Sequence, residues 1–138
     1  MTEENRAGEV DLEYRVPYAD TDQMGVVYYA NYFVYFERLR NELFRGLGRA
    51  YAAIEEEGLY LPVAEAQAEY LRPARYDDVL NIKGWFSWVQ GSRIRIEYEI
   101  LREGELLTIG STIHATISRE GAPRRAPTLI REFLDGFR

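Results

Sequence analysis

Hydrophobic and polar residues alternate near the start of the chain. Val10, Leu12, Tyr14 and Val16 are apolar or aromatic, and charged residues occupy the positions between them. This period of two predicts a β-strand with one buried face, which Pro17 ends or places at a sheet edge. Residues 1–9 lack the pattern and are expected to form a flexible tail.

The period becomes helical after residue 28. One stripe of the expected helix is apolar and comprises Tyr32, Phe36, Leu39 and Leu43. The opposite side is charged, as expected for a helix that packs one face against a core. Gly46 and Gly48 end this helix, and a shorter one is predicted from residue 49 to 57, before Gly58.

The rest of the chain is mainly predicted as strand. Alternation indicates strands at residues 63–71, 79–89, 93–101 and 106–118, with a turn at 102–105. In the first of these, Ala64, Ala66 and Ala68 share a face, which is expected to point inward and let a helix lie close to the sheet. Thr128 is expected to cap a short C-terminal helix.

This order of elements predicts a single α+β domain over residues 10–138. A strand, a long helix, a short helix and four strands follow one another, and most connections between the last strands are short enough for antiparallel pairing. We expect a curved five-stranded sheet around a long central helix. Such a sheet keeps open edges, so pairing with another subunit is expected.

Composition narrows the function classes. Apolar residues make up 46% of the 138 residues, and the net charge of −6 argues against general nucleic-acid binding. There are no cysteines, which excludes disulfides, a cysteine nucleophile and thiolate metal sites. The polar first residues and the lack of a long apolar run predict a cytoplasmic protein without membrane insertion.

Candidate chemistry is concentrated in residues 20–37, where a strand leads through a turn into the long helix. Asp22 is expected beside the amino end of that helix, where unpaired N–H groups and the helix dipole favour developing negative charge. A carboxylate facing such a helix start suits acyl transfer or hydrolysis. By itself, an aspartate before a helix is more often a cap. Asp20 is interpreted as structural, accepting hydrogen bonds from turn N–H groups.

The single histidine, His114, is not expected to be catalytic. It lies in a predicted strand and shares a polar face with Thr108, Thr112, Thr116 and Ser118. The isoleucines at 109, 113 and 117 occupy the other face, so His114 is predicted to lie on the polar side. No His, Asp and Glu residues have metal-ligand spacing, and no serine has a histidine partner in its sequence context.

The chain resembles hotdog-fold thioesterases of the 4-hydroxybenzoyl-CoA thioesterase type and the related bacterial short-chain acyl-CoA thioesterases. The resemblance covers roughly residues 10–135. It is carried by Asp20-Thr21-Asp22, Gly25-Val26-Val27-Tyr28, Asn31-Tyr32, Phe36-Glu37 and the segment 73–80. It implies hydrolysis of an acyl-CoA or aryl-CoA thioester to a carboxylate and free CoA. No metal or redox cofactor is implied, because CoA is part of the substrate.

By this resemblance, Asp22 is the nucleophile or general base, and the backbone N–H of Tyr29 is the oxyanion donor. Two positions depart from the family pattern. Many bacterial relatives have histidine where this chain has Tyr29, although tyrosine occurs there in the hydroxybenzoyl-CoA branch. The hydroxybenzoyl-CoA enzyme also holds CoA phosphate with arginines near positions 89–92, and here the nearest arginine is Arg93.

The remaining candidates are contacts to the substrate. Acyl-group or thioester contacts are expected from Gly25, Tyr28, Asn31, Tyr32, Leu61, Pro62 and Val63, and CoA contacts from Arg93, Arg72, Arg75 and Ser92. The family implies a homodimer or homotetramer with sites at subunit interfaces. Two alternatives stay open: a non-catalytic module that binds acyl-CoA or acyl-carrier protein, and a hydratase or dehydratase on the same fold. The second is disfavoured, because those enzymes use a histidine in the early loop or helix.

Overall fold

A computed structural model describes residues 6–136 of the chain, except for the side chains of residues 49 and 50. The elements in order are β1 (Ala7–Arg15), the short 3-10 helix η2 (Tyr18–Asp20), α1 (Asn31–Arg45), α2 (Arg49–Glu56), β2 (Val63–Tyr70), β3 (Val79–Gln90), β4 (Arg93–Arg102), β5 (Glu105–Ala115) and α3 (Thr128–Asp135). Each helix and strand predicted from the sequence is present, with boundaries that differ by at most about three residues, as is usual for such boundaries.

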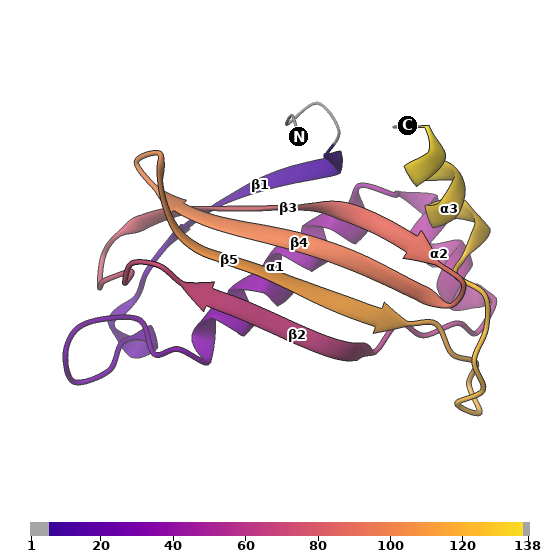
Figure 1. Ribbon diagram of the computed structural model, residues 1–138, viewed down its shortest axis with the longest axis horizontal. Helices are drawn as coiled ribbons and strands as arrows, with labels where there is room; N and C mark the ends of the chain where they lie inside the picture. Colours follow the sequence, from indigo (N-terminus) through magenta and orange to yellow (C-terminus); the bar gives the residue numbers. More distant parts are fainter. Residues whose placement is uncertain (1–5, 137–138) are drawn as a thin grey trace.

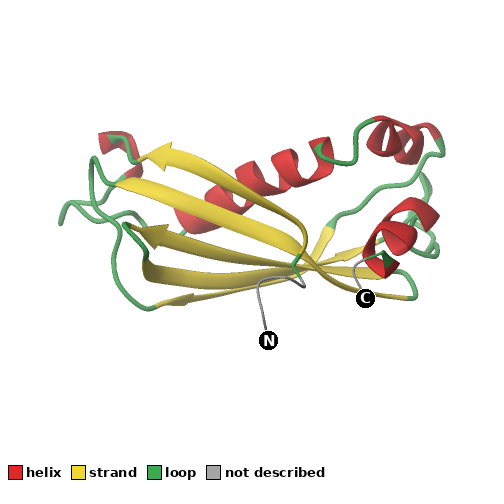
Figure 2. Cartoon of the chain, turned by 90° about the horizontal axis from the view of Figure 1, so that it is seen from above, coloured by secondary structure: helices red, strands yellow, loops and turns green. Residues whose placement is uncertain are grey.

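The five strands form one antiparallel sheet in the order β1-β3-β4-β5-β2. Strand β2 is therefore an edge, and it lies along the lower side of the sheet in Figure 1. Helix α1 crosses one face of the curved sheet, as Figure 2 shows from above. This confirms the predicted α+β hotdog architecture.

Helix α1 supplies the centre of the core. Its predicted apolar stripe is buried, and Tyr35 is buried with it at 1% exposure. The ring of Phe36 stacks on that of Tyr98 in β4, with the two centroids 4.4 Å apart. Burial of each such large side chain contributes about 2 kcal/mol, so this stripe fixes the helix on the sheet.

Two glycines let α1 approach the sheet closely. A Cβ at Gly84 of β3 would collide with Leu39, and a Cβ at Gly110 of β5 would collide with the Phe36 ring. At Gly110 the added atom would also lie 2.9 Å from the backbone oxygen of Gln67. Both positions therefore need the absence of a side chain, which is one established use of glycine within a strand.

The prediction for the alanines of β2 is only partly correct. Ala68 packs against the core, but Ala64 and Ala66 are exposed. Because β2 is the edge strand, α1 does not cover its whole length. The close approach of helix and sheet depends on glycines of β3 and β5 and not on these alanines.

The predicted polar face that carries His114 is present on β5, and the structure shows that this face is buried. His114 is 3% exposed, and the polar residues on its face are also buried: Thr108, Thr112, Thr116 and Ser118. This face lies under α1, whereas the isoleucines of β5 are half-buried on the other side of the sheet. Thr112 and His114 bond each other, and Thr112 also bonds Tyr98, which offsets part of the cost of burying these polar groups.

Corrections at the chain ends are small. Strand β1 begins at Ala7, which is buried and pairs with Phe86, so residues 7–9 belong to the sheet. The rest of the expected tail, residues 1–5, lies outside the described residues. Thr128 is the first residue of α3 and not its cap, because Pro127 keeps an extended ψ of 134° immediately before it. Between residues 6 and 136, no helix has both the length and the apolar character needed to span a membrane.

Candidate active site

A tight hairpin turn places Asp22 next to the start of α1. The backbone N–H of Asp22 donates to the oxygen of Val26 at 2.8 Å, and the N–H of Tyr28 donates to the oxygen of Asp20 at 2.9 Å. Gly25 closes the turn with a φ of +79°, in the left-handed region that glycine adopts readily. The two sides of this turn therefore hold Asp22 and the residues before α1 in a fixed relation.

The Asp22 carboxylate is half-buried and only partly used by the turn. Its Oδ1 atom accepts hydrogen bonds from the N–H groups of Met24 at 2.8 Å and Val26 at 3.4 Å. Within residues 6–136, no hydrogen bond is made to the second oxygen, Oδ2. Asp22 thus caps the turn with one oxygen and keeps the other available for chemistry.

The start of α1 leaves backbone donors open. Ala30, in the N-cap position, already has helical dihedral angles, and its side chain provides no cap. Among the described residues, no hydrogen bond engages the N–H of Tyr29, while its oxygen accepts one from the Tyr70 hydroxyl at 3.3 Å. Free N–H groups at a helix start are suited to binding an oxyanion.

Asp20 and Asn31 hold this arrangement together. The Asn31 side-chain amide donates to the backbone oxygen of Asp20 at 2.9 Å. The Asp20 carboxylate accepts hydrogen bonds from the hydroxyls of Tyr14 and Tyr35, each at 2.8 Å. These bonds support the structural role predicted for Asp20, but the predicted partners were wrong, because the side chain binds two phenols and not turn N–H groups. Burial, and then the bond to Asp20, raise the pKa of Tyr35 far above its usual value.

An aromatic pocket of about 310 Å³ opens beside Tyr29. It is lined by Val27, Tyr29, Tyr32, Tyr70, Leu71, Arg72 and Pro73. The ring of Tyr32 lies 5.0 Å from that of Tyr70, and the Tyr32 hydroxyl accepts a hydrogen bond from the N–H of Ala74. Sequence reasoning did not single out Tyr70, although its position at the end of an alternating strand was a usable signal.

Several predicted residues meet at this end of the molecule. Asp22, Gly25, Tyr28, Tyr29, Asn31 and Tyr32 belong to the turn and the helix start. Arg72 lines the pocket and forms an ion pair with Glu105 at 3.0 Å. Arg75 pairs with Val26 through a β-bridge, so it lies directly beside the turn. Two of the candidate CoA-binding arginines are therefore close to the candidate chemistry.

The other predicted contacts lie at the opposite end of β2. Tyr70 pairs with Thr108, whereas Val63 pairs with His114, and seven residue steps along β2 span about 23 Å. Leu61 and Pro62 precede Val63. Ser92 belongs to the turn between β3 and β4, and Arg93, the first residue of β4, forms an ion pair with Glu65 at 3.2 Å. Within one chain these residues do not join Asp22.

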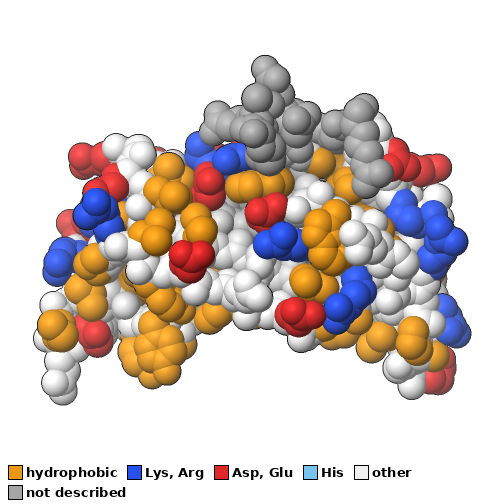
Figure 3. All heavy atoms as spheres, viewed as in Figure 1, with side chains coloured by type: hydrophobic (Ala, Val, Ile, Leu, Met, Phe, Trp, Pro, Cys, Tyr) orange, Lys and Arg blue, Asp and Glu red, His pale blue; other side chains and the backbone are white. Residues whose placement is uncertain are grey.

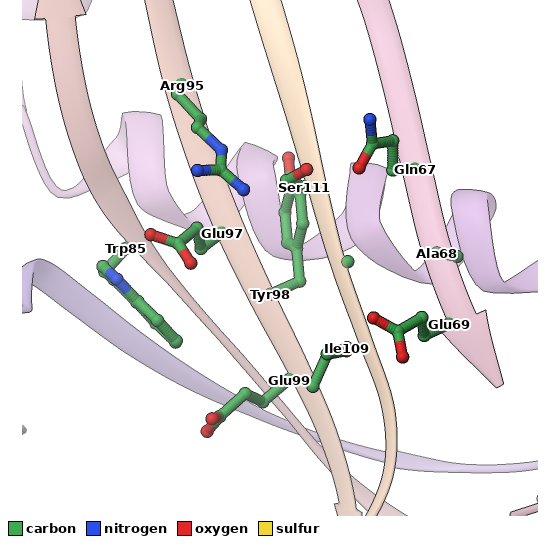
Figure 4. A pocket seen from close by; sticks show the side chains of 11 residues that line it. Gln67, Ala68, Glu69, Trp85, Arg95, Glu97, Tyr98, Glu99, Ile109 and Ser111 are labelled. Atoms are coloured by element: carbon green, nitrogen blue, oxygen red, sulfur yellow. The ribbon is translucent and has the colours of Figure 1, made fainter. Parts of the chain in front are cut away.

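A separate hollow of about 320 Å³ lies on the face of the sheet away from α1 (Figure 4). Its side chains come from several strands and include Gln67, Trp85, Arg95 and Glu97. Figure 3 shows acidic, basic and apolar side chains interspersed over this face. None of the predicted site residues lines this hollow, so we do not assign the candidate chemistry to it, although it is as large as the pocket beside Tyr29.

Comparison with known proteins agrees with this geometry. The profile of the thioesterase-like superfamily matches residues 16–136. The acyl-CoA thioester hydrolase YbgC of Escherichia coli O6:H1 is 34% identical over 102 residues, which cover 69% of this chain and 76% of that protein. The structure of DHNA-CoA thioesterase from Staphylococcus aureus is 35% identical, with a TM-score of 0.77 over 93% of this chain and 85% of that one. The chain therefore belongs to the thioesterase-like superfamily.

Proposed function

We propose that this protein is an acyl-CoA thioesterase that hydrolyses an acyl or aryl thioester to a carboxylate and a free thiol. The observation that supports the proposal is the tight turn, which joins Asp22, with one carboxylate oxygen left open, to the open N–H of Tyr29 seven residues later. Water is the only co-substrate, and no cofactor is required. CoA is the proposed carrier, with acyl-carrier protein as a second carrier to test, and the proposed location is the cytoplasm.

Two routes use the same groups. In the first, an oxygen of Asp22 attacks the thioester carbonyl, and the oxyanion forms against the Tyr29 N–H. Collapse expels the thiolate, which takes up a proton, and water then hydrolyses the mixed anhydride and restores the carboxylate. In the second, Asp22 removes a proton from a water molecule that attacks the carbonyl directly, and collapse of the oxyanion breaks the C–S bond and releases the thiolate, which takes up that proton. In both routes a single oxyanion donor is worth about 10²–10³ in rate.

The aromatic pocket beside Tyr29 is the proposed place for the acyl group. Tyr32 and Tyr70 supply apolar ring surfaces, and Arg72 lies at the rim, where a phosphate of the carrier can meet it. Arg75 lies on the other side of the turn, beside Val26. Rings of this kind accept flat aryl groups as well as short alkyl chains.

A homodimer through β2 would complete the site. Strand β2 is an open edge, and its first residue, Val63, and the neighbouring Val34 of α1 are each 46% exposed. These two residues line a hollow of about 270 Å³ between α1 and β2, together with Glu37 and Arg40, which are one helical turn apart. A two-fold axis can place Glu37 of one copy opposite Arg40 of the other, and the reverse, so the two charges would complement each other across the interface.

Antiparallel pairing of two β2 strands also accounts for the separated candidates. A two-fold axis reverses the direction of the second strand, so the Val63 end of one copy approaches the Tyr70 end of the other. Leu61, Pro62, Val63 and Arg93 would then reach the partner's Tyr29 end. Each site would draw its carboxylate and oxyanion donor from one chain and part of its wall from the other.

The decisive test is release of CoA from a panel of short, long and aryl acyl-CoAs. A thiol-reactive dye reports the product cleanly, because the chain has no cysteine. We expect Asp22→Asn to lose about 100-fold or more in kcat/KM. Asp11→Asn on β1 is the matched control and should keep full activity. A folded wild-type protein that hydrolyses no thioester, whether on CoA or on acyl-carrier protein, would refute the hydrolase and favour the binding module.

A further inference from the structure

A chain of hydrogen bonds crosses the core from α1 to the segment before β2. Arg40 donates to the hydroxyl of Tyr98 at 3.2 Å, and that hydroxyl lies 2.6 Å from Thr112 Oγ1. Thr112 Oγ1 lies 2.9 Å from His114 Nε2, and His114 Nδ1 lies 2.9 Å from the backbone oxygen of Leu61. Tyr98, Thr112 and His114 are each at most 3% exposed, so water does not compete for these bonds.

Only one arrangement of protons satisfies every member of this chain. The oxygen of Leu61 can only accept, so the neutral imidazole of His114 must carry its proton on Nδ1. Nε2 then accepts from the Thr112 hydroxyl, which in turn accepts from Tyr98. The guanidinium of Arg40 can only donate, so the Tyr98 oxygen accepts from it. All four side chains are thereby fixed in direction.

The end of this chain lies at an irregularity in the sheet. The pairing of β2 with β5 shifts register between Val63 and Glu65, which marks a bulge. Pro62 still offers its oxygen to the backbone N–H of Ala115, at 3.1 Å, but the Leu61 oxygen bonds to the His114 ring. The imidazole thus takes the place of a backbone donor for Leu61 and helps set the direction in which Leu61–Val63 leaves the sheet.

The same hydrogen-bond chain reaches the hollow beside Val63. Two of its members, Arg40 and Thr112, line that hollow together with Val63. We propose that His114, through its neutral Nδ1–H form, is a positioning residue that fixes the Leu61–Val63 wall and thereby sets which acyl groups the site accepts. This inference rests on the proposed thioesterase function and on the proposed pairing through β2, because only together do they assign the wall to the acyl site.

Protonation of His114 would reverse the order of the chain. An imidazolium donates from both nitrogens, so Thr112 would have to accept from Nε2 and donate to Tyr98, whose own proton would then face Arg40. The charged group that acts on His114 is Arg40, and Glu37 lines the neighbouring hollow together with Arg40 and Thr112. Burial, together with the Arg40 charge, lowers the pKa of His114 despite the bond to Leu61. The neutral form is therefore kept at neutral pH.

The first test is nuclear magnetic resonance of the imidazole in the tag-free protein. His114 is the only histidine, so selective labelling of histidine gives one set of ring signals that reports both tautomer and titration. We expect the Nδ1–H tautomer and a titration midpoint below about 6.5, the usual value. An Nε2–H tautomer, or a midpoint at or above that value, would overturn the proposal. This result does not depend on any catalytic activity.

The second test compares Thr112→Val with Thr112→Ser, which keeps the hydroxyl. Binding of a series of S-alkyl-CoA thioethers, which cannot be hydrolysed, is measured by calorimetry. We expect Thr112→Val to lower the affinity for the thioether with the longest bound alkyl group by about tenfold, and to change the affinity for the shortest by less than about twofold. The affinities of Thr112→Ser should stay close to those of wild type. Equal profiles for the two variants, both folded by circular dichroism, would refute the positioning role. If wild type binds the thioethers but hydrolyses none of the corresponding thioesters, only the proposed hydrolysis is refuted.

Discussion

Asp20 and Asp22 are two residues apart, yet their surroundings give them different tasks. The Asp20 carboxylate accepts hydrogen bonds from the hydroxyls of Tyr14 in β1 and Tyr35 in α1. The Asp22 carboxylate meets only backbone N–H groups of its own turn, and one of its oxygens stays open among the described residues. The same side chain therefore stabilises the fold at one position and is available for chemistry at the other.

Asp20→Ala is expected to lower the free energy of unfolding by about 2 kcal/mol or more, because it leaves two phenol hydroxyls without their acceptor. Tyr14→Phe removes only one of the two bonds and should cost less than half as much. Urea unfolding followed by circular dichroism measures both variants. A loss of under about 0.5 kcal/mol for Asp20→Ala would show that these hydrogen bonds contribute little net stability.

The buried tyrosines make stability depend on pH in the alkaline range. Burial raises the pKa of Tyr32, Tyr35 and Tyr98 above the ordinary value of about 10. The unfolded chain therefore loses these protons first, so the stability they support is complete below about pH 10 and falls as pH rises beyond it. We expect phenolate absorbance of these residues to appear together with unfolding. If Tyr32, Tyr35 or Tyr98 lost its proton at about pH 10 while the protein stayed fully folded, this expectation would be contradicted.

At the scale of elements, the closeness of α1 to the sheet depends on Gly110. Gly110→Ala would push a methyl group into the Phe36 ring and towards the backbone oxygen of Gln67, neither of which can yield easily. The expected loss is about 1–3 kcal/mol, the usual cost of overpacking a core. Gly136→Ala, at the end of α3 with only ordinary contacts, is the control and should change stability by less than about 0.5 kcal/mol. Thermal unfolding of both variants decides the comparison.

Local patterns predicted the elements but not which face of β5 is buried. A period of two is the same whichever side faces the core, and hydropathy favoured the isoleucines over the side that carries His114. The buried side is viable because Thr112 and His114 find partners on β4 and before β2, far away in sequence. Such non-local bonds leave no signal in the local pattern.

For the candidate site as well, residues close together in the sequence were predicted, and residues brought in from distant strands were not. Asp22, Tyr29 and Asn31 lie within ten residues, so their proximity follows from one turn and one helix start, and the sequence predicted them together. Tyr70 reaches the Tyr29 oxygen from another strand and was not singled out. Arg93 was grouped with the others by resemblance, but the register of the sheet puts it at the far end of β2.

At the scale of the whole molecule, one chain carries the two parts of the proposed site at opposite ends of one sheet edge. The turn and helix start lie near Tyr70, and the Leu61–Val63 wall lies near His114. Between them runs the exposed edge of β2, with the apolar and oppositely charged residues of α1 beside it. The proposed two-fold pairing of this edge would bring each part to its complement and would cover the exposed valines in the same step.

Val34→Asp tests this pairing. Val34 lines the hollow beside β2 together with Glu37 and Arg40, and Arg40 already donates to Tyr98. The proposed interface would therefore bury a second carboxylate beside Glu37, at a cost of several kcal/mol. We expect wild type to sediment as a dimer or larger assembly, and Val34→Asp to sediment as a folded monomer with acyl-CoA turnover reduced at least about tenfold. Leu129→Asp on α3, a residue of similar exposure at 41%, is the matched control and should leave both properties unchanged. A wild-type protein that is active as a monomer would show that one chain holds the whole site.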